Sequence, residues 1–189
     1  MRVISGTAKG RKLKRVPGDS TRPIMDRVKE SLFNIVREWT GEARWYDMFG
    51  GTGAVGIEAL SRGAAQVTFT DNTRAAILTI IDNLKHTRLD DHAIVRQIDA
   101  FQFVREYQGE PFDLIYVAPP QYKSLWRDAL LLLDEAVPTI LLGDGLVVVQ
   151  IDPREYEAQT LQNLILYDQR TYGTTMLCFY ERPSPDNSD

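Results

Sequence analysis

Trp45-Tyr-Asp-Met-Phe-Gly-Gly-Thr-Gly-Ala-Val-Gly-Ile-Glu-Ala-Leu60 is the stretch that decides the fold. It begins as a short apolar run, breaks into glycines and continues as a helical pattern, which predicts a strand, a tight turn and a helix. Gly50, Gly51 and Gly53 have no Cβ, so the turn can adopt positive φ and let a ligand lie against its backbone. The following helix would direct its free N–H groups at that ligand.

Two acids extend this pattern. Asp47 lies at the carboxyl end of the predicted strand, where ligands bind in open α/β sheets. Asp71 ends the next apolar run, about 20 residues after Gly51, the spacing at which a carboxylate meets the hydroxyls of a ribose. These features predict a nucleoside cofactor, either NAD or S-adenosylmethionine. The alternative is an ordinary turn whose glycines serve close packing alone.

The composition predicts one α/β domain with a basic amino end. The chain has 189 residues, of which 43% are hydrophobic and 25% charged, as in ordinary globular proteins. Residues 1–44 hold 11 Lys and Arg against 5 Asp and Glu, a net charge of +6, which leaves −10 for the remainder of a chain of net charge −4. This asymmetry predicts a local contact with a polyanion, and a solvated basic tail is the alternative.

The sequence also bears on location and metals. No apolar run approaches the ~20 residues of a membrane span, and we find no signal peptide. Cys178 is the only cysteine, and His86 and His92 stand apart from it, so neither a disulfide nor a zinc site is expected. We therefore expect a cytoplasmic protein without a metal.

Strands and helices alternate along the rest of the chain. A helix is predicted over residues 124–133, with a further short helix over 134–142. The predicted strands after the first are 66–71, 93–98, 112–117 and 145–151, followed by an antiparallel pair at 164–167 and 174–180. This alternation favours a mostly parallel sheet with helices on both faces.

The amino end predicts a β-hairpin, because residues 1–5 and 11–16 alternate polar and apolar side chains around two glycines. A helix should follow, with Asp26 as its N-cap. A basic ribbon of this kind can follow a phosphate backbone through salt-dependent contacts. Its cations are Lys9, Arg11, Lys12, Lys14 and Arg15.

Three separated parts of the chain resemble the RsmD family. The opening of that family is similar to Arg2-Val-Ile-Ser-Gly6, Lys9-Gly-Arg-Lys-Leu13, Thr21-Arg-Pro23 and Asp26-Arg-Val-Lys-Glu-Ser-Leu-Phe-Asn34. Its cofactor motif resembles residues 47–64, and its catalytic motif falls at 113–122. The resemblance covers most of residues 1–151. Members of the family are S-adenosylmethionine-dependent enzymes that methylate N2 of a guanine in 16S ribosomal RNA of the small subunit.

The resemblance implies a Rossmann-like class I methyltransferase. Its seven-stranded, mostly parallel sheet would have the order 3-2-1-4-5-7-6, with a small N-terminal β-hairpin added. Residues 1–40 would form the basic hairpin and helix that contact RNA, 41–182 the methyltransferase domain, and 183–189 a disordered tail. The partner would be 16S ribosomal RNA or an assembly intermediate of the small subunit, bound by a monomer.

The resemblance also implies roles for individual residues. Asp71 would accept both ribose hydroxyls, and Asp99 would accept from the adenine amino group, although a helix N-cap is the alternative for Asp99. The cofactor-binding set is Asp47, Gly50, Gly51, Gly53, Asp71, Asp99 and Ala100. The RNA-binding set is Lys9, Arg11, Lys12, Lys14, Arg15, Arg22 and Lys29.

The catalytic stretch departs from the family pattern. The family has Asp or Asn, two prolines, then Tyr or Phe; this chain has Ala118, Pro119, Pro120, Gln121 and Tyr122. The family's acid or amide accepts a hydrogen bond from the guanine amine and so holds it in line with the methyl group. Ala118 has no acceptor, so we expect backbone carbonyls near 118–119 and the Gln121 oxygen to accept, while Tyr122 stacks on the base. Transfer would be a direct displacement with inversion, without a covalent enzyme intermediate.

Three other functions remain open. A methyltransferase acting on an amine of DNA or protein is one, since the proline pair is shared across N-methylating classes. The chain could bind cofactor and RNA yet methylate slowly or not at all, as an RNA-binding or ribosome assembly factor on the same fold. An NAD-dependent oxidoreductase would explain the glycines and Asp71, but it would leave the basic hairpin and the proline pair unexplained.

Overall fold

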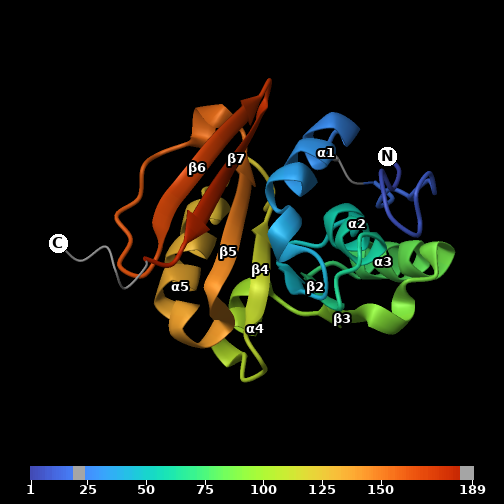
Figure 1. Cartoon of the computed structure of the whole chain (residues 1–189), viewed down its shortest axis with the longest axis horizontal. Coiled ribbons are helices and arrows are strands. Elements are labelled where there is room, and N and C mark those ends of the chain that lie inside the picture. Colours follow the sequence, from blue (N-terminus) through green and yellow to red (C-terminus); the bar gives the residue numbers. More distant parts are fainter. Residues whose placement is uncertain (19–23, 184–189) are drawn as a thin grey trace.

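The protein is seen here as a computed structural model that describes residues 1–18 and 24–183. Within these residues a seven-stranded sheet lies between two layers of helices (Figure 1). The strands are β1 Arg44–Asp47, β2 Gln66–Asp71, β3 Ala93–Gln97, β4 Phe112–Val117, β5 Leu141–Ile151, β6 Ile165–Tyr172 and β7 Thr175–Glu181. Their order is β3-β2-β1-β4-β5-β7-β6, and β7 runs antiparallel to both β5 and β6. The predicted class and strand order are confirmed.

Helices cover both faces of the sheet. On one face lie α1 Asp26–Ile35, α2 Ala54–Ser61 and α3 Arg74–Thr87, and on the other α4 Ala100–Glu106 and α5 Leu125–Ile140 (Figure 1). Short 3₁₀ turns occur at Arg37–Trp39, Asp90–His92 and Pro153–Glu155. Because neighbouring side chains of a strand point to opposite faces, Trp45 packs in the core on the first face and Tyr46 in the core on the second. A sheet buried on both faces explains the unbroken apolar run at residues 146–149 of β5.

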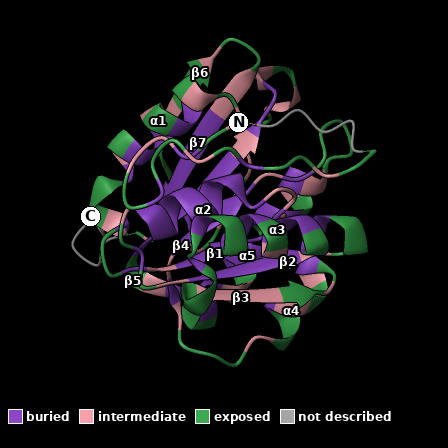
Figure 2. Ribbon diagram, turned by 90° about the vertical axis from the view of Figure 1, so that its right-hand side faces the viewer, coloured by how far each residue is buried: buried purple, intermediate pink, exposed green. Residues whose placement is uncertain are grey.

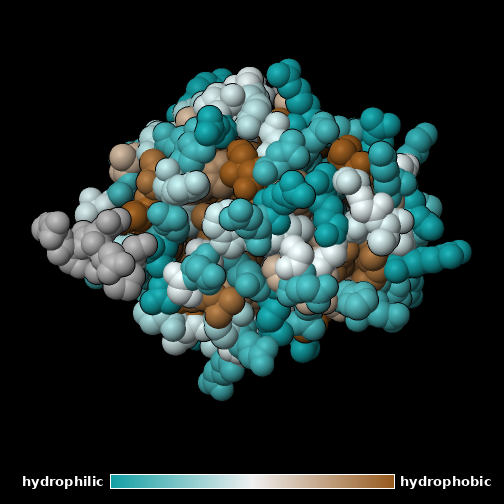
Figure 3. Space-filling model, viewed as in Figure 1, coloured by the Kyte–Doolittle hydropathy of each residue, from teal (hydrophilic) through white to brown (hydrophobic). Residues whose placement is uncertain are grey.

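The surface is ordinary for a globular protein. In the view of Figure 3 it is largely hydrophilic, and its apolar residues lie in small separate groups. No helix within the described residues has the length and apolar character needed to cross a membrane.

The helix expected to end at residue 133 continues instead to Ile140, so the predicted division into two helices is wrong. Pro138 lies within its last turns and cannot donate a hydrogen bond to the carbonyl of Asp134. The Asn163 side-chain amide donates to that carbonyl at 2.9 Å, and the Asp134 carboxylate accepts from the backbone N–H groups of Asn163 and Leu164. Contacts distant in sequence therefore satisfy the group that proline leaves free, and β5 begins at Leu141 rather than at Gly145.

The amino end pairs as a hairpin does, but through one isolated antiparallel bridge between Arg2 and Lys12 rather than through two strands. The reason is that several backbone groups bond elsewhere: the N–H groups of Ile4 and Ser5 donate to the Glu58 carboxylate at 2.8 and 2.9 Å. We call residues 1–16 the arm. The N-cap predicted at Asp26 is also wrong by one residue, since Met25 precedes the helix and Asp26 pairs with Arg2 at 3.1 Å.

The arm lies against α2, the helix that follows the glycine turn. All eight residues of α2 are buried, and Figure 2 shows this helix enclosed near the middle of the molecule. The Ser61 hydroxyl accepts from the N–H of Ala8 and donates to the carbonyl of Ser5, at 2.9 and 2.6 Å. A Cβ at Gly6 would lie only 1.6 Å from the carbonyl oxygen of Ser61, so the arm approaches the helix as closely as glycine allows.

A buried group of charges joins α1 to the same helix. Glu58 forms ion pairs with Lys29 at 3.0 Å and with Arg62 at 2.9 Å, and the side chains of Glu58 and Lys29 have no exposed surface. Lys29 also donates to the carbonyl of Arg2 at 2.6 Å. The prediction that Lys29 contacts RNA is therefore wrong, because its ammonium group pairs with Glu58 inside the protein and no part of the side chain reaches solvent.

Replacing Lys29→Met should destabilise the fold. A buried ion pair that loses one partner costs about 3–5 kcal/mol, and we expect the lower end because Arg62 and two backbone N–H groups still serve Glu58. Chemical denaturation would measure the free energy of unfolding. Arg27→Met is the matched control, an exposed cation on the same helix, and equal losses in the two variants would contradict the structural role of Lys29.

Candidate cofactor and substrate site

The candidate site lies at the carboxyl edge of the parallel strands. Asp47 ends β1, Asp71 ends β2, and Asp99 follows β3, so the sheet brings the three predicted acids to one edge. Ala118 follows β4, the neighbour of β1 on its other side. Asp71 and Asp99 thus lie on one side of the glycine turn, and the proline loop lies on the other.

The glycine turn needs its glycines for two different reasons. Gly51 and Gly53 have φ of +52° and +74°, a conformation that side chains rarely adopt. Gly50 lies in a tight place, since a Cβ there would lie 2.7 Å from Cδ1 of Ile80 and 3.2 Å from the carbonyl oxygen of Thr70. Gly56 is required in the same way, at 2.3 Å from the ring of Phe69. The two reasons are therefore backbone conformation and close packing, and nucleotide-binding turns use glycine for both.

Asp47 is buried and holds the start of α2. Its carboxylate accepts from the N–H of Gly56 at 3.2 Å. Burial raises the pKa of Asp47 to about 7, the Gly56 N–H opposes this rise, and the charge of Asp71 adds to it. A cation placed at the turn would favour the ionised form, so this carboxylate is suited to a positively charged ligand.

Asp71 and Asp99 each use hydrogen bonds to shape the edge. Asp71 accepts from the N–H of Gly51 at 3.0 Å and from the N–H and hydroxyl of Thr73 at 2.9 Å. Asp99 is the N-cap of α4, as the alternative interpretation had it, and accepts from the N–H groups of Phe101 and Gln102 at 3.0 Å. Both bonds use one oxygen, so Oδ2 has no partner within the described residues. Ala100, the next residue along the chain, is buried.

The chemistry of the edge distinguishes the two cofactor classes. Asp47 and Asp71 bond the glycine turn and the start of its helix, and Asp99 lies farther along the same edge. A pyrophosphate at the turn would therefore meet like charges, whereas a sulfonium and an ammonium group would meet opposite ones. The residues present fit S-adenosylmethionine: Asp71 and Asp99 offer acceptors for hydroxyl and amino groups, and Asp47 offers a counter-charge. The NAD-dependent alternative is therefore disfavoured by the acids themselves.

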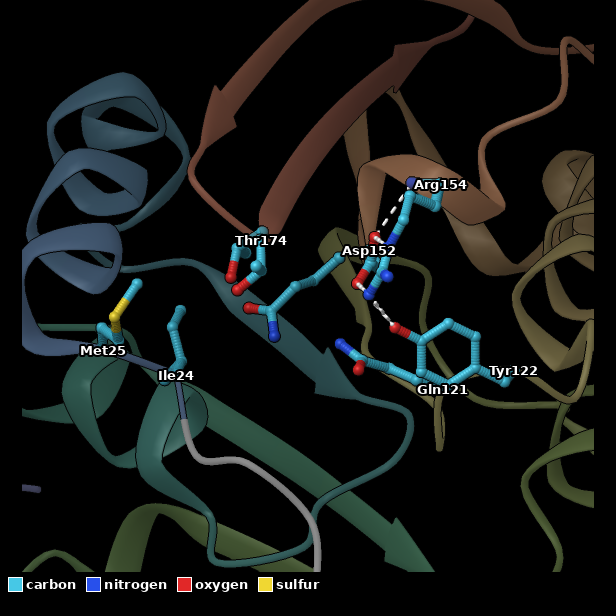
Figure 4. Close-up of a pocket in the computed structure, with 9 residues that line it drawn as sticks. Ile24, Met25, Gln121, Tyr122, Asp152, Arg154 and Thr174 are labelled. Carbon is cyan, nitrogen blue, oxygen red and sulfur yellow. Dashed lines mark hydrogen bonds and ion pairs between the residues drawn. The ribbon is translucent and has the colours of Figure 1, made fainter.

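A pocket opens beside this edge, at the ends of β4 and β5. Figure 4 shows Ile24 and Met25 on one side of it and Gln121 and Tyr122 on the opposite side. Gln121 and Tyr122 belong to the predicted catalytic stretch, and both are exposed. The lining residues are Ile24, Met25, Gln121, Tyr122, Gln150, Asp152, Arg154, Thr174 and Thr175.

Tyr122 is held in place by a pair that the sequence interpretation missed. Its hydroxyl donates to Asp152 at 2.7 Å and accepts from Arg154 at 2.6 Å (Figure 4). Arg154 also bonds both carboxylate oxygens of Asp152, and these bonds hold the pKa of Asp152 well below its usual range. The signal in the sequence is an Asp-x-Arg directly after the buried strand β5. Tyr122 keeps an exposed ring with a fixed hydroxyl.

The cations of the arm fall into two groups. Lys14 pairs with Asp82 at 2.8 Å, and Arg11 donates to the carbonyl of His86. Lys9, Lys12 and Arg15 are exposed and have no ion pair with any residue that the structure describes. Arg22 lies outside the described residues.

Asn83 ties the arm to the glycine turn. Its side-chain N–H donates to the carbonyls of Lys14 and Thr52 at 3.1 and 2.9 Å, and its oxygen accepts from the N–H of Lys14 at 2.8 Å. The arm therefore runs beside the turn rather than apart from it.

Solved structures resemble this arrangement closely. The Escherichia coli protein yhhF is 32% identical, with a TM-score of 0.84 over 96% of this chain and 97% of that one. An RNA methyltransferase from Salinibacter ruber, in complex with S-adenosyl-L-homocysteine, has the same fold at 16% identity, with a TM-score of 0.66 over 89% and 98% of the two chains. Fold and site together define a class I S-adenosylmethionine-dependent methyltransferase.

Sequence comparison gives the family. Residues 1–181 match the family model described as Conserved hypothetical protein 95. YlbH of Bacillus subtilis strain 168 is 39% identical over 96% of this chain and 99% of its own. The Ribosomal RNA small subunit methyltransferase D of Escherichia coli strain K12 is 30% identical over 100% and 93%. The chain belongs to this family, the RsmD family, as its motifs indicated.

Asp47→Asn should change how cofactor affinity depends on pH. The carboxyl group is largely neutral below its pKa of about 7 and ionised above it, whereas the amide keeps an acceptor for Gly56 but never ionises. The cationic cofactor prefers the ionised form, so the affinity advantage of the wild type over the variant should grow as the pH rises toward about 7 and level off above it. Titration calorimetry with S-adenosylmethionine at several pH values would measure it. A constant ratio of affinities would contradict a direct electrostatic role for Asp47.

Proposed function

We propose that this methyltransferase transfers a methyl group from S-adenosylmethionine to the exocyclic N2 of a guanine in 16S ribosomal RNA of the small subunit. The observation that carries the proposal is the adjacency of three features: the acidic glycine turn, the pocket at the proline loop, and the basic arm that Asn83 bonds to the turn. Relatives across the whole chain are named as small-subunit ribosomal RNA methyltransferases, which supports the same substrate.

The residues of the edge would bind and orient the cofactor. Gly50, Gly51 and Gly53 would shape the methionine side, Asp71 would accept the ribose hydroxyls, and Oδ2 of Asp99 would accept from the adenine amine, with Ala100 beside it. S-adenosylmethionine, when bound, supplies an electrophilic methyl group on a sulfonium. The division of labour follows the chain: residues 1–40 contact RNA, and 41–182 bind the cofactor and the target base.

The pocket would receive the target nucleotide after it leaves its stack. Tyr122 would stack on the base, and its hydroxyl bonds to Asp152 and Arg154 hold the ring before the base arrives. A stacking contact contributes roughly 1–3 kcal/mol per base. Backbone carbonyls near Ala118 and Pro119 would help to orient the amine, and Pro120 would stiffen the loop that carries them.

The arm would contact the phosphate backbone of the RNA through Lys9, Lys12 and Arg15, whose charges are free of ion pairs with the described residues. Arg11 and Lys14 would contribute less, because each already has a partner inside the protein. We further propose that the protein acts as a monomer in the cytoplasm on the RNA or on an assembly intermediate of the subunit.

Cells that lack this protein should lose an N2-methylguanosine from 16S ribosomal RNA. Mass spectrometry of nucleosides from cells with and without the protein would detect the loss. Purified protein should move a labelled methyl group onto RNA or subunits from the deficient cells. Transfer to neither would favour an assembly factor without catalysis. Quenching of protein fluorescence by NADH but not by S-adenosylmethionine would favour an oxidoreductase.

Lys12→Ala should weaken RNA binding in a salt-dependent way. Each phosphate contact that is lost lowers the slope of log affinity against log salt by about 0.7–0.9, without changing which sequence is preferred. Filter binding to small-subunit RNA at several salt concentrations would measure the slope. Arg105→Ala, an exposed cation on α4 at the opposite face of the sheet, is the matched control and should leave the slope unchanged.

A further inference from the structure

Ala118 has no side-chain acceptor, and the strand beside β4 on this side is β5. β4 and β5 are parallel and in register, with Tyr116 opposite Val148 and Val117 opposite Val149. The next position of each strand holds Ala118 and Gln150. By the alternation of a strand, Ala118 and Gln150 share the face of Tyr116 and Val148. A carboxamide thus lies directly beside the position where a carboxylate or amide is lacking.

Gln150 lines the pocket, and its amide group is fixed. It is half-buried, and its Oε1 accepts from the Tyr116 hydroxyl at 2.5 Å. Tyr116 is buried, and burial raises its pKa well above the ordinary value, so the hydroxyl keeps its proton and remains a donor. This donor decides which end of the amide is the oxygen. The Nε2 group has no partner among the described residues.

A carboxamide oriented in this way matches one edge of guanine. On that edge the N2 amine donates and the neighbouring N3 accepts. An amide oxygen can accept a second hydrogen bond, and the amide nitrogen can donate. The two pairs form side by side, which makes the contact bidentate. Adenine carries no amine at this position and would leave the oxygen without its second donor.

We propose that Gln150 binds the N2–N3 edge of the target guanine and takes the accepting role that Ala118 cannot perform, with Tyr116 as the residue that positions it. This inference rests on the proposed function and assigns the substrate contact within it. During transfer the N2 lone pair forms the new N–C bond as the S–C bond breaks. The sulfur keeps that electron pair, and the surplus proton leaves the amine for water.

Gln121 is the competing candidate for this role, and the geometry favours Gln150. Gln121 lies on the exposed loop, and its amide has no hydrogen bond to the described residues. Gln150 lies at the end of a buried strand, and a neighbouring hydroxyl holds its oxygen in place. An acceptor that is oriented before the substrate arrives costs less to use than one that must be ordered on binding.

The test is a loss and a rescue, measured as turnover on small-subunit RNA or subunits from cells without the protein. Gln150→Met keeps the side-chain length but removes the amide, and turnover should fall by at least about tenfold while the affinity for S-adenosylmethionine stays the same. Adding Ala118→Asn to this variant restores an acceptor on the neighbouring strand and should recover much of the loss. A role in packing alone could not be rescued from position 118.

Three further variants complete the design. Gln169→Met is the matched control, a half-buried glutamine on β6, and should keep wild-type turnover. Tyr116→Phe removes only the positioning hydroxyl and should lower turnover by a smaller factor, which tests the idea even if Gln150→Met fails to fold. Gln121→Met should lose less turnover than Gln150→Met.

Several outcomes would overturn the assignment. These are wild-type turnover in both Gln150→Met and Tyr116→Phe, no rescue by Ala118→Asn in a variant that still binds cofactor, or a larger loss in Gln121→Met. Failure of the proposed function itself would look different, because the wild-type protein would then transfer no methyl group to any of these substrates.

Discussion

The structure depends on one buried carboxylate. Glu58 lies on α2 with no exposed surface, so its charge must be met inside the protein. Lys29 and Arg62 provide the opposite charge, and the N–H groups of Ile4 and Ser5 complete its hydrogen bonds. These four partners come from three places: Ile4 and Ser5 from the arm, Lys29 from α1 and Arg62 from the end of α2 itself. The single carboxylate therefore fixes the amino end of the chain onto the helix that begins at the glycine turn.

This attachment explains why the arm belongs to the catalytic part of the molecule. Val3, Leu13 and Leu32 lie in the same apolar core as Trp45 and Phe69 of the sheet. Asn83 adds polar bonds from the arm to Thr52 within the turn. The arm is thus bonded at Glu58 and at Asn83, which fixes its position relative to the glycine turn. RNA bound to its exposed cations would therefore stand at a constant distance from the methyl group.

Most of the fold could be predicted because it rests on local patterns. The glycine turn, the acids after successive strands and the alternation of strand and helix each follow from a few neighbouring residues. The exceptions depend on partners far away in sequence. Lys29 is predicted as a surface cation because its buried partner, Glu58, is distant in sequence. The hairpin lacks a continuous ladder of backbone hydrogen bonds because the N–H groups of Ile4 and Ser5 donate to the same Glu58. The helix through Pro138 continues because Asn163, distant in sequence, takes the freed carbonyl. The bonds of Asp152 and Arg154 to Tyr122 were not predicted because about 30 residues separate them from it in the sequence.

Ala118 departs from the family motif, and the side chain that we propose in its place lies on a different strand, outside the motif. A motif lists residues along one strand, whereas a parallel sheet places the end of the next strand about 5 Å away and in register. A side chain lost at the end of β4 can therefore be replaced in space by one at the end of β5, with no trace in the local sequence. Position 116 fits this view, because the Tyr116 hydroxyl holds the Gln150 oxygen, a contact that phenylalanine could not make. The acceptor would thus have moved between strands while the pocket kept its chemistry.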